Sequence, residues 1–160
     1  PSFAHEQISH LKTGREKANK TFENFEIVST IPIVPGRDLE MCANLVRPYA
    51  ALYVGGMGSK EKNFYNALAV RMGYEKEAAV VQEKYLAKDY EAAMMALPFD
   101  FLDQTSLLGG PDRMAEKMQE HAAAGVTTLA LALPDSVPYE ARIRGLRMAV
   151  EALDKSGVGE

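Results

Sequence analysis

Two runs of apolar residues limit what this chain can fold into more than any other feature. Ile31-Pro32-Ile33-Val34 ends a predicted strand over residues 25–34, and a second run fills a predicted strand over residues 126–133. Successive apolar positions are typical of parallel strands that are covered on both faces. Pro32 has no N–H group for a sheet ladder, so we expect the first strand to be irregular or to lie near a sheet edge.

Predicted helices separate these strands along the chain. A third strand is predicted over residues 105–108, and turns are expected at residues 21–24 and 99–104. Helices are predicted over residues 2–20, 38–55, 59–73, 75–87, 89–97, 111–124 and 138–155, with Asp38 and Ser59 as N-caps. The alternation of strands and helices indicates right-handed crossovers and a parallel sheet, so the predicted fold class is α/β.

The predicted sheet is too small to be complete. Three parallel strands do not close a barrel, and the edges of a sheet are normally paired or protected. The chain also begins at Pro1 rather than with a methionine. We interpret residues 1–160 as a single domain cut from something longer. We expect the missing strands to come from another segment or from a second copy in a homo-oligomer.

Composition and charge argue against several classes of function. A net charge of −4 and the lack of a Lys/Arg run argue against a nucleic-acid partner. The longest apolar stretch, Val126–Pro134, is too short to span a membrane, and no signal peptide is visible. The single cysteine, Cys42, cannot form an internal disulfide, so a reduced cytoplasmic setting is expected. Cys42 is interpreted as a core thiol rather than a nucleophile.

The strongest local candidate for a ligand site is the turn after the second strand. Gly109 and Gly110 precede a predicted helix start, where free N–H groups and the helix dipole favour an anion. Arg113 would add a charge-assisted hydrogen bond. In the alternative interpretation, the glycines only make a tight turn, and Asp112 complements the helix dipole and would repel an anion.

A second candidate is the glycine-rich loop between two predicted helices. Its residues are Gly55, Gly56, Gly58 and Ser59, and the nearby basic residues are Lys60, Lys62 and Arg71. A glycine-rich backbone beside basic side chains would hold a phosphate or the acidic tail of a coenzyme. The spacing is not that of a P-loop. The alternative is a helix–helix connection with solvated lysines.

The remaining polar and apolar candidates are weaker. Residues 33–36, at the end of the first strand, are apolar and would line a pocket for a ring without doing acid–base work. His5, His10 and His121 lack the spacing of a helical metal pair and are interpreted as structural or exposed. The sequence shows no metal motif and no Ser-His-Asp set, so no metal site is predicted and the catalytic residues stay unknown.

Six segments together form a recognisable set. They are Tyr53–Gly58, Lys62–Asn66, Arg71–Tyr74, Glu26–Gly36, Ser106–Arg113 and Ala124–Leu129. The set resembles the luciferase-like monooxygenase family, in the actinobacterial branch that depends on the deazaflavin coenzyme F-420. The resemblance covers nearly the whole chain but only the latter half of the family's length. It implies a partial TIM (β/α)8 barrel, with roughly strands six to eight, their helices and a helical insertion.

The resemblance also implies a function. Members bind a flavin or deazaflavin at the carboxyl ends of the barrel strands and are frequently dimeric. We therefore expect the carboxy-terminal portion of an oxidoreductase that transfers hydride between coenzyme F-420, or alternatively FMN, and an unknown small organic substrate. In relatives the catalytic groups come largely from the first five strands, so the chain alone is expected to be inactive. The alternative is a non-enzymatic, helix-rich binding or assembly module, because no catalytic cluster is visible.

Overall fold

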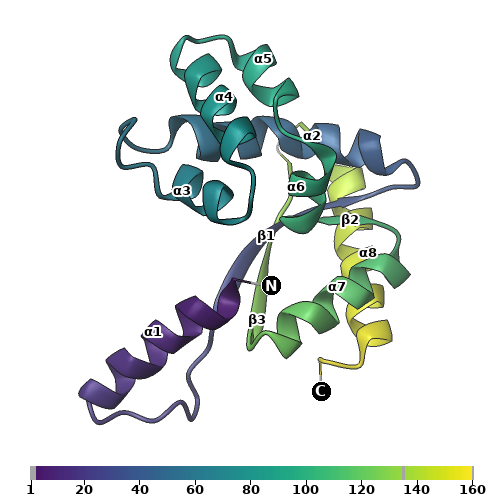
Figure 1. Cartoon of the computed structure of the whole chain (residues 1–160). Coiled ribbons are helices and arrows are strands. Elements are labelled where there is room, and N and C mark those ends of the chain that lie inside the picture. Colours follow the sequence, from purple (N-terminus) through teal and green to yellow (C-terminus); the bar gives the residue numbers. More distant parts are fainter. Residues whose placement is uncertain (1–2, 135, 160) are drawn as a thin grey trace.

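The computed structural model describes residues 3–134 and 136–159 of the chain (Figure 1). Its strands are β1 (Val28–Pro35), β2 (Leu107–Gly109) and β3 (Thr128–Ala132). Its helices are α1 (Ala4–Lys17), α2 (Leu39–Ala51), the π-helix η1 (Leu52–Gly56), α3 (Phe64–Arg71), α4 (Glu75–Leu86), α5 (Tyr90–Met95), α6 (Phe99–Gln104), α7 (Pro111–Ala123) and α8 (Tyr139–Ser156). The predicted α/β class is confirmed.

The strand β1 forms the centre of the sheet. All pairings are parallel, and the strand order is β2-β1-β3. The segment Val28–Pro32 pairs with β3, whereas Ile33–Pro35 pairs with β2. Pro32 is thus the point at which β1 changes partner, which agrees with the irregularity predicted from its missing N–H group.

The strand order corrects one expectation. Strands six, seven and eight of a (β/α)8 barrel are neighbours in sequence order. Here β3 pairs with β1 instead of β2. Because β2 has three residues and β1 has eight, β1 offers the pairing length that β3 needs. The described residues form an open sheet, and the partial barrel stays a prediction.

Two apolar clusters cover the two faces of the sheet. The first joins Val34 and Leu108 to residues of α2, η1 and α3 to α6. The second joins Ile33 and Leu107 to residues of α7 and α8. Since neighbouring residues of a strand point to opposite faces, the two clusters lie on opposite sides of the sheet. Burial on both faces is what the apolar runs predict.

A buried arginine fixes α2 against the helical region. The guanidinium of Arg47 donates to the carbonyls of Met94 and Leu97 and to the side chain of Asn44. It also lies 2.8 Å from a carboxylate oxygen of Glu40. A buried charge is tolerated only when it is paired, so this network holds α2 and α5 in one arrangement.

Two local predictions are wrong. Residues 99–104, expected as a turn, form α6, which is stabilised by the burial of Phe101 and Leu102. The helix expected to start at Ser59 begins at Phe64, because the buried Asn63 is its N-cap and accepts from the N–H of Asn66 at 3.0 Å. Ser2, the predicted start of the first helix, lies outside the described residues.

Candidate functional site

The carboxyl ends of β1 and β2 meet at a backbone contact. Pro35 pairs with Gly109, and the N–H of Gly36 donates to the Gly109 carbonyl at 3.2 Å. Gly109 has a φ of 106°, a conformation that other residues rarely adopt. A Cβ at Gly109 would also lie 3.0 Å from side-chain atoms of Leu39 and Arg113. The predicted tight turn is confirmed, and it requires glycine at this position.

The next residue, Gly110, opens the start of α7. It is the N-cap, and the N–H of Met114 donates to its carbonyl at 3.1 Å. The N–H groups of Asp112 and Arg113 precede this bond and therefore lack intrahelical acceptors. A Cβ built on Gly110 would meet no heavy atom within 4 Å, so the space beside the turn is open. Free N–H groups at an open helix start suit an anion.

The connections from β1 and β2 leave toward opposite faces of the sheet. β1 leads to α2, which packs in the first apolar cluster, and β2 leads to α7, which packs in the second. In open parallel sheets, ligands bind outside the carboxyl ends of strands whose connections diverge in this way. The Gly109–Gly110 turn therefore lies where this topology places a ligand crevice.

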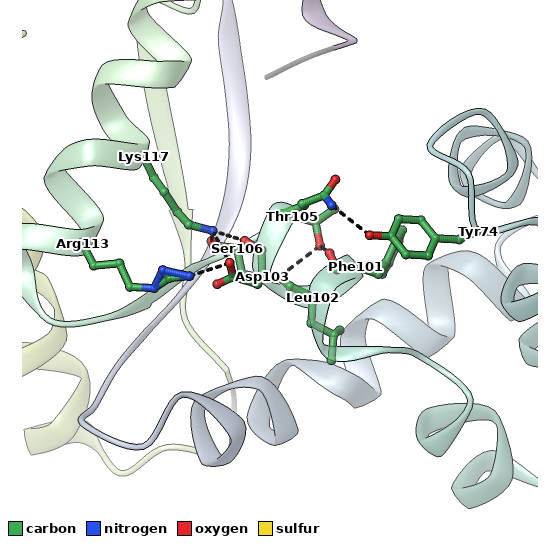
Figure 2. A network of polar contacts seen from close by, with 9 residues as sticks. Tyr74, Phe101, Leu102, Asp103, Thr105, Ser106, Arg113 and Lys117 are labelled. Atoms are coloured by element: carbon green, nitrogen blue, oxygen red, sulfur yellow. Dashed lines mark hydrogen bonds and ion pairs between the residues drawn. The ribbon is translucent and has the colours of Figure 1, made fainter.

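The side chain of Arg113 passes beside Gly109 and continues to a carboxylate. One of its terminal nitrogens lies 2.5 Å from Oδ2 of Asp103, and Nζ of Lys117 lies 3.2 Å from the same oxygen (Figure 2). Lys117 also donates to the carbonyls of Asp103 and Ser106. We call Asp103, Ser106, Arg113 and Lys117 the Asp103 cluster. The side chain of Arg113 is thus paired with Asp103 in this cluster, so it does not point to the space where the turn would hold an anion.

The Asp103 cluster was not predicted. Asp103 falls in a segment that was expected to be a turn, and no motif connects it with Lys117. Burial lowers the pKa of Lys117, and the nearby Asp103 carboxylate opposes this shift. Two cationic side chains therefore share one carboxylate at the amino end of β2.

The thiol of Cys42 lies at the same strand ends. A Cβ at Gly36 would be 2.5 Å from Sγ of Cys42, and the N–H of Gly109 donates to this sulfur. Burial raises the pKa of Cys42, so the neutral thiol is favoured. Cys42 packs in the first apolar cluster, which confirms the interpretation as a core thiol.

Close packing explains the glycines of the second candidate loop. A Cβ at Gly55 would lie 2.5 Å from Cβ of Tyr85, and one at Gly56 would lie 2.3 Å from the Tyr85 ring. Gly58 has a φ of 104°, and Ser59 is exposed. The structure therefore gives the glycines a structural role, and a ligand at this loop stays a prediction.

The two candidate sites do not come together. Leu39, at the start of α2, contacts the Gly109 position, whereas Gly55 and Gly56 lie in η1 beyond the other end of α2. A helical rise of about 1.5 Å per residue separates them by roughly 20 Å. A single small coenzyme group cannot contact both loops.

Sequence comparison identifies the family of the chain. The profile of the luciferase-like monooxygenase family matches residues 1–128. The chain belongs to this family. The match includes the Gly109–Gly110 turn and ends at the first residue of β3.

The chain is also similar to a protein with a descriptive name. It is a protein of Mycobacterium tuberculosis described as a coenzyme F-420-dependent oxidoreductase, and it is 31% identical over 115 residues. The alignment covers 72% of this chain and 33% of the relative, so the chain spans about a third of the relative's length.

The histidines of the chain, its possible metal ligands and its longest helices also bear on the predictions made from the sequence. His5 and His10 are exposed and His121 is half-buried, as predicted. Over residues 3–134 and 136–159, no group of three His, Cys, Asp or Glu residues is placed to hold a metal ion. In the same residues, no helix has the length and apolar character needed to cross a membrane.

Proposed function

We propose that this luciferase-like chain is the carboxy-terminal portion of an oxidoreductase. Its reaction would transfer hydride between coenzyme F-420, or alternatively FMN, and a small organic substrate. The observation that carries the proposal is the Gly109–Gly110 turn, an open helix start at the carboxyl edge of the sheet in a chain of this family. The name of the mycobacterial relative favours F-420 over FMN.

The turn fits the phosphate-bearing side chain of either coenzyme. The N–H groups of Asp112 and Arg113 would donate to the phosphate oxygens, and the open space beside Gly110 would admit them. The coenzyme, when bound, supplies the ring carbon that carries the hydride. The role of this chain would then be to bind and orient the coenzyme.

The charge of Asp112 is compensated at this turn. Nζ of Lys155 lies 2.7 Å from a carboxylate oxygen of Asp112 and 3.2 Å from one of Glu151. A paired carboxylate repels an anion less than a free one does. The sequence-based objection that Asp112 repels an anion is therefore weakened.

Substitution of Gly110 tests the proposed site. Gly110→Asp would place a carboxylate in the space for the anion, while Asp is a favourable N-cap for α7. We expect coenzyme binding to weaken by about tenfold or more, because like charges in contact repel strongly. The matched control, Gly110→Ala, adds a methyl group to the same space without a charge, so it should weaken binding much less than Gly110→Asp. Fluorescence titration with F-420 and absorbance titration with FMN measure both affinities.

Two outcomes would overturn the proposal. If the unchanged chain binds neither F-420 nor FMN, the coenzyme assignment is wrong. If Gly110→Asp binds as tightly as Gly110→Ala, the coenzyme is not at this turn. A stable monomer that binds neither coenzyme would favour the alternative, a non-enzymatic binding module.

We also propose that the chain self-associates. In the described part of the chain, β3 pairs only with β1, and the neighbouring α8 exposes Leu146, Val150 and Leu153. An open strand edge beside exposed apolar side chains favours association. Light scattering should give a mass above that of one chain, and a monomer at high concentration would contradict the proposal.

A further inference from the structure

A cavity of about 940 Å³ lies at the amino end of β2, away from the Gly109–Gly110 turn. Its walls include Ser29 and Thr30 of β1 and the Asp103 cluster, which joins the end of α6 to α7. This volume is in the range of sites for small molecules. The proposed coenzyme site lies at the opposite end of β2, so a function must be sought for this cavity separately.

Polar side-chain atoms of the Asp103 cluster lack hydrogen-bond partners. Oγ of Ser106 and Oδ1 of Asp103 are buried without a hydrogen bond, and Ser106 is 0% exposed. Buried polar atoms are normally paired, because an unpaired one carries the full loss of its hydration. A hydroxyl and a carboxylate oxygen in one cavity wall therefore call for a ligand that accepts one hydrogen bond and donates another.

The charge of the cluster favours an anion. Asp103 is compensated by both Arg113 and Lys117, which leaves the cluster with one excess positive charge. Lys117 donates to three oxygen atoms of the protein, but Arg113 contacts Asp103 through one nitrogen and its side chain is 31% exposed. The Nε of Arg113 is also buried without a hydrogen-bond partner, so the cluster has a further donor for an anion. Because these atoms are buried, binding would require the Arg113 side chain to move.

Other titratable residues also line the cavity. They are Glu116, Glu120, His5 and His121. The two glutamates and His5 are exposed, so solvent screens them more than it screens the cluster. Lys117 donates to the Ser106 carbonyl and Arg113 pairs with Asp103, so the positive charge of the cluster lies beside Ser106.

We propose that this cavity binds a phosphate group that carries its own proton, as hydrogen phosphate or the monoanionic form of a phosphate monoester. An anionic oxygen of the phosphate would accept from Ser106 and face Arg113. The P–OH group would donate to Oδ1 of Asp103. This site would use the side chain of Arg113, whereas the coenzyme turn would use the backbone N–H groups of Asp112 and Arg113. The two sites therefore adjoin at Arg113 but have different donors.

The proton distinguishes phosphate from sulfate. Both anions have tetrahedral oxygens, but sulfate at neutral pH has no proton to donate to Asp103. We expect the chain to bind phosphate about tenfold more tightly than sulfate, since a hydrogen bond to a charged group has roughly this effect. Isothermal titration calorimetry at constant ionic strength measures both affinities. Glycerol 3-phosphate, as a third ligand, shows whether the natural ligand is a phosphate ester or free phosphate. If it binds more tightly than phosphate, the ligand is an ester, and if it binds more weakly, the ligand is the free ion.

Two variants locate the site. Ser106→Ala removes only the unpartnered hydroxyl, so the fold should persist while phosphate binding weakens about tenfold. Asp103→Asn should turn its oxygen to Arg113 and Lys117 and its NH2 group to the ligand. This variant should lose the preference for phosphate over sulfate. Ser9→Ala, on the exposed side of α1, is the matched control and should bind phosphate normally.

The results that overturn this proposal differ from those that overturn the coenzyme site. These tests use the Gly110→Asp background, in which the turn is blocked. There, equal affinity for phosphate and sulfate, or an unchanged phosphate affinity in Ser106→Ala, would exclude the Asp103 cluster as the site. Neither result bears on coenzyme binding, which depends on Gly110. An effect of Gly110→Asp alone would assign the phosphate to the turn and also reject the proposal.

Discussion

Gly55 leaves no room for a side chain between η1 and α4. Its Cβ position lies 2.5 Å from Tyr85 Cβ and 3.1 Å from the backbone carbonyl of Val81. Because a backbone atom is involved, a side-chain rotation alone does not relieve the overlap. The sequence made the same glycine a candidate for phosphate binding. If its role is packing, a substitution should lower stability, and if its role is binding, a substitution should lower phosphate affinity.

We predict that Gly55→Ala lowers the free energy of unfolding by about 1–3 kcal/mol, the range for overpacking a well-packed site. Urea denaturation measures the change. Gly14→Ala is the control, because its Cβ meets no atom within 4 Å in the exposed helix α1. This control should gain about 0.5–1 kcal/mol. An unchanged stability of Gly55→Ala would show that the packing here is loose.

The half-buried His121 gives the chain a predicted pH dependence. Burial lowers the pKa of His121 below its ordinary value of 6.5, and the neighbouring Glu120 opposes the shift. The folded state therefore disfavours the protonated form. The associated stability is present above pH 6.5 and is lost as the pH falls through the lowered pKa.

Replacement of His121 by glutamine should make the stability less sensitive to acid. We expect the difference in unfolding free energy between pH 7.5 and pH 5, measured by urea denaturation, to be smaller in His121→Gln than in the unchanged chain. His5→Gln, at an exposed position of α1, serves as the control. Equal acid sensitivity of both variants and the unchanged chain would contradict the role of His121.

At the scale of elements, two asparagines hold η1 in place. The Asn63 side chain donates to the carbonyls of Tyr53 and Val54, both at 3.0 Å. The Asn66 side chain donates to the carbonyls of Val54 and Ala78, at 3.1 and 2.9 Å. Carbonyl groups at a helix end need such partners, so the asparagines join η1, α3 and α4.

Removal of the Asn66 amide should loosen these three elements. We predict that Asn66→Ala lowers the unfolding free energy by about 1–3 kcal/mol, since two carbonyls lose a donor. Hydrogen–deuterium exchange should also become faster in η1. The control is Gln82→Ala, whose exposed amide donates to the carbonyl of Lys60, and it should change stability by less than about 0.5 kcal/mol. Unchanged exchange in η1 would show that the asparagine bonds do not hold it.

Element types were largely predictable from the sequence, but some ends were not. Asp38 was correctly predicted as the N-cap of α2, because the pattern of cap and apolar stripe is local. The start of α3 was missed because Asn63 is fixed by carbonyls of η1, which come together with it only in the folded chain. The short helix α6 was missed because Phe101 and Leu102 are stabilised by burial, which a local pattern does not reveal.

At the scale of the whole molecule, the parallel sheet was predictable and its strand order was not. The apolar runs correctly indicated strands covered on both faces. Which strands become neighbours depends on contacts between distant segments, such as the pairing of Val28 with Thr128. The Asp103 cluster escaped prediction for the same reason, since Asp103 and Lys117 belong to different elements. The glycine turn was found because its chemistry lies in consecutive residues.

One measurement tests the central claim, that the carboxyl edge of the sheet binds the anionic group of the coenzyme. In a titration of the isotope-labelled chain with coenzyme F-420, amide NMR signals report the binding site. The proposal predicts saturable shifts for Gly36, Gly110, Asp112 and Arg113, with Gly55–Ser59 unaffected. Shifts confined to Gly55–Ser59, or no saturable shifts at the carboxyl edge, would contradict it.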